Sequence, residues 1–133
     1  GERLFVAYDN QDQEDEHSCF SDNTHRDLIA NAQGIANVLS GQYARPDGTI
    51  LSGPGLLSLL AAQDAPLAAR LGELAGTALA AVGQLHVPFD RAIVETEHRP
   101  AVLAAVNALQ DQGDALAQAA AALGLPINTA LPE

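Results

Sequence analysis

The sequence has no lysine, no tryptophan and no methionine, and its six arginines stand against 17 Asp and Glu residues. The formal net charge is −11. A nucleic-acid partner is therefore not expected, because neutralising phosphates requires clustered Lys and Arg. Binding to an anionic membrane surface is disfavoured for the same electrostatic reason.

Long apolar runs and paired cysteines are also missing. No run approaches the ~20 apolar residues that span a bilayer, so we expect no transmembrane segment, and no signal peptide is recognisable. Cys19 is the only cysteine, which excludes a disulfide within the chain. We expect its thiol to be a small buried apolar group. Binding a metal and pairing with a segment outside this chain are the alternatives.

Aromatic residues make up only 4% of the 133 residues, whereas Ala and Leu are abundant. This composition favours closely packed helices over a β-sheet. Apolar residues recur at intervals of three and four, as in helices with one buried face. We predict an all-α, up-down bundle of about four main helices in a single domain, residues 1–133. The expected helices are residues 2–10, a second from Ser21–Asn23 to Gly41, a short one over residues 56–60, a long one capped by Asp64 that ends before Pro88, and a last from Arg99 to Leu123. Turns are expected over residues 42–55 and at Pro88-Phe89-Asp90. The expected core stripes are Leu28, Ala32, Ile35 and Leu39 in the second helix, and Val102, Val106, Leu109, Gly113, Leu116, Ala120 and Leu123 in the last.

Residues 17–27 are the most chemically varied part of the chain, with two imidazoles, two carboxylates, a thiol, three hydroxyls, an Asn and an Arg. Such groups are costly to order unless they satisfy one another or a ligand. Residues 1–27 also hold eight Asp or Glu against two Arg. This acidic region is either a solvated loop or a surface that concentrates cations.

The segment EDEHSCFSDNTHRD, residues 14–27, is continued by Asn31, Gly34 and Asn37. It resembles the second half of imelysin-like proteins, which are bacterial cell-envelope proteins. The family includes iron-regulated protein A and was historically classed as insulin-cleaving metallopeptidases. The resemblance covers the whole chain, including Pro88-Phe89-Asp90 and the Ala-rich last helix. It implies half of a two-bundle fold, a periplasmic or envelope location, and a role in iron acquisition.

One departure from the family pattern concerns the metal motif Gly-x-His-x-x-Glu, which lies in the first half of the family. None of the four histidines here, His17, His25, His86 and His98, has a Glu three residues later. The resemblance therefore implies that this chain is the C-terminal half, and that its partner is an N-terminal bundle carrying the motif. His86 and His98 fall at expected helix ends, where an imidazolium suits the dipole or a turn, and we give them no role.

On a helical wheel, Asn23, Asp27, Asn31 and Gly34 share one narrow face of the second helix. Asn and Asp are poor interior helix residues, so this placement indicates contact rather than helicity. A seam between two bundles and a ligand-lining face both fit. Arg26 is expected to pair with Asp22 or Asp27, or to bind an anion. The predicted ligand-binding residues are His17, Ser18, Ser21, Asp22, Asn23, Arg26, Asp27 and Asn31.

His17 and His25 are the predicted metal ligands, with Asp22 and Glu16 as candidate oxygen donors. Such donors suit iron or zinc, although the spacing matches no compact ligand motif. The alternatives are that His25 is a hydrogen-bonded residue at the edge of the core and that His17 donates to the acidic run. We reject a serine nucleophile built on Ser18 or Ser21, because no strand-turn-helix context surrounds either.

The predicted function is that of a helical half of a cell-envelope protein for iron acquisition. It contributes a polar cleft that binds a metal or a metal-bearing ligand together with the N-terminal half. The alternatives are a metallopeptidase domain and a purely structural interaction bundle. Hydrolysis needs a metal-bound water and a general base. Because both the His-Glu-x-x-His motif and the family's own motif are absent, we do not expect this chain alone to be a peptidase.

Overall fold

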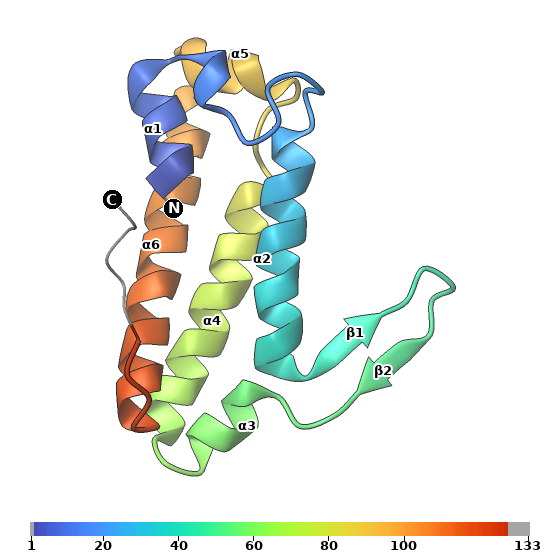
Figure 1. The fold of residues 1–133 in the computed structure, drawn as a ribbon, viewed down its shortest axis with the longest axis vertical. Helices are drawn as coiled ribbons and strands as arrows, with labels where there is room; N and C mark the ends of the chain where they lie inside the picture. The colour runs from blue at the N-terminus through green and yellow to red at the C-terminus, as the bar shows by residue number, and fades with distance from the viewer. Residues whose placement is uncertain (1, 128–133) are drawn as a thin grey trace.

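Three long antiparallel helices form the body of the molecule (Figure 1). The computed structural model describes residues 2–127. The long helices are α2 (Thr24–Ser40), α4 (Ala65–Val82) and α6 (Arg99–Ala122). The shorter α1 (Glu2–Asn10) lies beside the start of α6, so the chain runs up, down, up and down through four helices (Figure 1). The predicted all-α bundle is confirmed.

Short elements close the two ends of the bundle (Figure 1). One end holds the 3-10 helix η1 (Gln13–Asp15) and α5 (Phe89–Val94). The other holds α3 (Leu56–Ala61) and an antiparallel hairpin of β1 (Gln42–Ala44) and β2 (Ile50–Ser52). The sequence predicted only turns where the hairpin and α5 form. None of the helices described over residues 2–127 is both long and apolar enough to cross a membrane.

Local chemistry explains where the helices begin and end. The Asp64 carboxylate accepts the N–H of Leu67 at 2.9 Å and caps α4, which satisfies a donor left free at the helix start. α2 ends at Gly41, whose φ of 71° is left-handed, as is common after a helix. Gly41 is also needed for space, because a Cβ there would lie 2.2 Å from the Gly53 carbonyl oxygen. This close approach fixes how the hairpin leaves the bundle.

The core divides into two clusters along the long axis. The cluster nearer α5 contains Leu4, Phe89 and Ile93, and the cluster nearer α3 contains Leu60 and Leu71. All five side chains are at most 1% exposed. Phe89 and Ile93 come from α5, so the segment that carries Pro88 to Glu95 is anchored by burial of its apolar side. That anchoring sets the positions of the polar groups at both ends of α5.

The buried face of α6 follows the prediction at Val102 and Val106 and departs from it further along the helix. The sequence placed Gly113 in the seam, but Gly113 is exposed and has no heavy atom within 4 Å of an added Cβ. The buried positions are Val102, Ala105, Val106, Ala108, Gln112, Ala115 and Ala119. Alanine lets α4 and α6 approach closely, so the small side chains occupy the seam and the larger Leu109 and Leu116 flank it half-buried. The pattern of leucines therefore marked the edge of the contact rather than its centre.

Candidate functional site

The loop between α1 and α2 is held together by its own side chains. Asp12 caps η1 by accepting the N–H of Glu14 at 2.9 Å. The Gln13 amide donates to the Cys19 carbonyl at 3.4 Å and to the Asp22 carboxylate at 3.2 Å. Asp22 adopts a φ of 50°, a left-handed conformation that Asp tolerates better than most residues. The chain is thereby turned into α2, and Cys19 is half-buried and free.

Ser18 joins this loop to the first turns of α2. Its N–H donates to the Thr24 hydroxyl at 3.1 Å, and its own hydroxyl donates to the Asp27 carboxylate in a short hydrogen bond. Thr24 is completely buried, so it is a fixed anchor for the loop. Ser18 and Asp27 are thus two predicted site residues that the structure brings into direct contact.

His17 lies in the electrostatic field of the same carboxylate. Burial is the main cause that lowers the pKa of His17 below its ordinary value, and the Arg3 guanidinium lowers it further, whereas the Asp27 carboxylate raises it. A lowered pKa keeps the half-buried imidazole predominantly neutral near pH 7. Neutral imidazole is the form that binds a metal ion.

The remaining predicted residues, Ser21, Asp22, Asn23, Arg26 and Asn31, are all exposed. Ser21 donates to the Ser18 carbonyl at 3.4 Å. Among the hydrogen bonds and ion pairs of residues 2–127, none involves the side chains of Asn23, Arg26 or Asn31. The ion pair considered for Arg26 does not form in the described structure. The eight predicted residues are called the polar region below: His17, Ser18, Ser21, Asp22, Asn23, Arg26, Asp27 and Asn31.

Glu16 is a buried acid next to the polar region. It is 1% exposed, and neither carboxylate oxygen has a hydrogen-bond partner. Burial is the main cause that raises its pKa; the nearby Thr24 hydroxyl lowers it, and the Asp90 and Asp22 carboxylates raise it further. The half-buried His25 likewise has a buried Nδ1 without a partner. The loop therefore folds with polar groups left unsatisfied.

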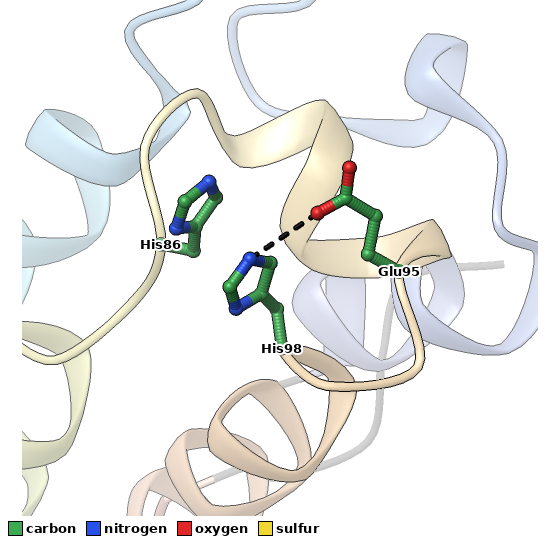
Figure 2. A group of neighbouring side chains, drawn as sticks. All are labelled: His86, Glu95 and His98. Atoms are coloured by element: carbon green, nitrogen blue, oxygen red, sulfur yellow. Dashed lines mark ion pairs between the residues drawn. The ribbon is translucent and has the colours of Figure 1, made fainter.

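The two predicted metal ligands do not join a group of three donors. Across residues 2–127, such a group of His, Cys, Asp or Glu side chains forms at His86, Glu95 and His98, whose donor atoms all lie within 4.8 Å of one another. Figure 2 shows these three side chains converging from the loop before α5, the end of α5 and the start of α6. His17 and His25 lie outside it.

The geometry of this group is well defined. The two imidazole rings are stacked, with centroids 3.7 Å apart and planes 8° from parallel. One carboxylate oxygen of Glu95 lies 3.2 Å from Nε2 of His98, and the other is 2.6 Å from Nε of Arg91. The hydrogen bond from Arg91 is the main cause that lowers the pKa of Glu95. The carboxylate therefore stays ionised at neutral pH.

The sequence analysis gave this group no role. One signal was present, because Glu95 and His98 have the Glu-x-x-His spacing that puts two donors on one turn. His86 has no such relation to them. It is brought to the other two residues because α5 folds back across the end of the bundle (Figure 1), which spacing along the chain does not reveal.

Comparison with known families places the chain. The family model of imelysin, a peptidase family by name, matches residues 1–116. The chain belongs to the imelysin family. No curated protein matches the chain significantly.

The imelysin match extends from α1 well into α6. It therefore includes both the polar region and the histidine group of this imelysin-family chain. The resemblance on residues 14–27 is confirmed at the level of the family.

Proposed function

We propose that this imelysin-family chain is one helical half of a bacterial cell-envelope protein that binds a metal ion or a metal-bearing ligand in the course of iron acquisition. The polar region contributes this half's side of the binding cleft. The location in the periplasm or envelope is part of the same proposal and rests on the family.

One observation supports the proposal: some side chains of the polar region are hydrogen-bonded to the protein, and others are not. Polar groups that a protein buries for structural reasons are expected to be paired with protein partners. Ser18 and Asp27 are paired in this way, so the loop is ordered. Asn23, Arg26 and Asn31 are exposed and make no side-chain bond to the rest of residues 2–127. An ordered support with free donors and acceptors suits ligand binding.

A second helical bundle is the partner that we propose for this surface. Further along α2, Asn31, Gly34 and Val38 line a groove of about 450 Å³ together with α3 and α6 side chains. Gly34 has open space around an added Cβ, so a neighbouring backbone can come close. Phe20, at the loop, is fully exposed at 103%. An exposed phenyl ring suits a partner surface because aromatic residues are enriched at protein interfaces.

The test uses this chain joined to the proposed N-terminal bundle, in which we expect the Gly-x-His-x-x-Glu motif. Metal content is measured by elemental mass spectrometry and affinity by titration with Fe²⁺ and Zn²⁺. Asp27→Asn removes a charge from the polar region with little change in shape. We expect it to weaken binding by at least about tenfold, since losing even an outer-shell partner costs 10–100-fold. Asp111→Asn, which changes an exposed acid on α6, is the matched control.

The outcomes separate clearly. Reduced affinity in Asp27→Asn with unchanged affinity in Asp111→Asn supports the proposal. Equal affinities in both variants would show that the polar region does not contribute to the ligand site. Phe20→Ser tests the partner surface separately, because it should weaken association of the two halves mixed as separate chains and leave the fold of this half unchanged.

A further inference from the structure

We propose that His86, Glu95 and His98 form a binding site for a zinc-like divalent transition-metal ion at the corner between α5 and α6. This site is distinct from the polar region. Two imidazole nitrogens and one carboxylate oxygen are a donor set that binds Zn²⁺ and Fe²⁺ with positions left open for water. Hard ions such as Mg²⁺ and Ca²⁺ prefer all-oxygen sites, so the proposed ion is a nitrogen-seeking one.

Two side-chain atoms that can bind a metal ion lack a hydrogen-bond partner at this position. Nε2 of His86 and Oε2 of Glu95 are both buried, and neither has a hydrogen-bond partner. Oε2 approaches Nε2 of His98 at 3.2 Å, a distance that makes an ion pair when the imidazole is protonated. Donors around a tetrahedral Zn²⁺ lie about 3.3 Å apart, given bonds of about 2.0–2.1 Å. The spacing of Glu95 and His98 therefore already fits coordination to one ion.

The surrounding charges leave the carboxylate available. Arg91 binds only Oε1 of Glu95, and a partner of this kind orients the ligand carboxylate. The Arg99 guanidinium follows His98 in the sequence but is directed elsewhere. It donates to the Tyr8 carbonyl at 2.9 Å and packs over the Tyr8 ring at 4.0 Å. Oε2 of Glu95 thus faces the two imidazoles without a competing cation.

Coordination requires one ring to turn. The lone pair of an imidazole nitrogen lies in the ring plane, so two parallel rings 3.7 Å apart cannot both direct their nitrogens at one ion. The His98 side chain is 28% exposed, and it makes no capping bond to α6. Its Nε2 already lies beside Glu95, so we expect the ring to tilt out of the stack with that nitrogen kept near the carboxylate. Binding replaces the ring stack by two metal–nitrogen bonds, with water in the remaining positions.

The test titrates this chain, residues 1–133, with Zn²⁺ by calorimetry and with Co²⁺ by visible absorption. We expect one tight site. His98→Ala and Glu95→Gln should each weaken it more than about 100-fold, because losing an outer-shell partner alone costs 10–100-fold. Arg91→Ala should weaken the site about tenfold, because Arg91 is an outer-shell partner that orients the Glu95 carboxylate. In proton NMR, the ring signals of His86 and His98 should shift together on Zn²⁺ addition, as the stack opens.

His17→Ala and His25→Ala are the controls and should bind the ion with wild-type affinity. Circular dichroism checks that each variant folds; if His98→Ala does not, Glu95→Gln, which keeps the side-chain shape, decides. Unchanged affinity in Glu95→Gln would overturn the assignment. So would loss of the site in His17→Ala, which would place the ion in the polar region instead.

Discussion

Glu16 offers the most direct check on the energetics of the loop, through the substitution Glu16→Gln. The carboxyl is 1% exposed and both of its oxygens lack a partner. Its pKa is raised above the ordinary value of 4.5, mainly by burial. The folded state therefore retains a proton on Glu16 that the unfolded state loses at lower pH. Gln has nearly the same shape but no charge to desolvate.

The sign of the pH effect follows from proton linkage. Between pH 4.5 and the raised pKa, the folded state binds more protons than the unfolded state, so the free energy of unfolding falls as pH rises. In Glu16→Gln this contribution to the fall in the free energy of unfolding is absent, because Gln does not titrate. Near pH 4 the two proteins should be about equally stable. Near pH 8 the variant should be more stable by about 1.4 kcal/mol for each unit by which burial raises the pKa of Glu16.

The assay is urea unfolding followed by circular dichroism at several pH values from 4 to 8. Comparing each variant with the wild type cancels the contributions of all other titrating groups. Glu14→Gln, at an exposed acid two residues away, is the control and should show no such gain. If the stability difference between Glu16→Gln and wild type stays constant across this pH range, the carboxyl is not desolvated in the folded protein and the reasoning fails.

Three further predictions concern the scaffold, each read by the free energy of unfolding in urea. Leu71→Ala should destabilise by about 2–5 kcal/mol because Leu71 is 0% exposed, whereas Leu59→Ala, at 57% exposure, should cost far less; equal losses would contradict the assigned core. Gly48→Ala should cost about 1–2 kcal/mol for its left-handed φ of 83°, and Gly41→Ala should cost clearly more because its Cβ also meets backbone at 2.2 Å. Asp64→Ala should cost about 1 kcal/mol through loss of the α4 cap, and a neutral result would show that the cap is not needed.

The sequence predicted the helices well where a single face is buried. On α2, three of the four expected stripe residues, Leu28, Ala32 and Leu39, are buried and Ile35 is half-buried. Gly41 ends the helix as expected. On α6 the same reasoning placed the seam one position away, at Gly113 instead of Gln112. A helix rich in alanine has apolar side chains on every face, so periodicity alone cannot select the face that packs.

By itself, the sequence determined the all-α class, the principal helices, the family resemblance on residues 14–27 and the polar variety of that segment. These features depend on local propensity, on spacing and on residue identity, which a linear chain displays. Tertiary structure alone decided that Glu16 is buried without a partner and that His86 meets Glu95 and His98. Both depend on how α5 and the loop before α2 fold against the end of the bundle, and packing between segments distant in the sequence sets that arrangement.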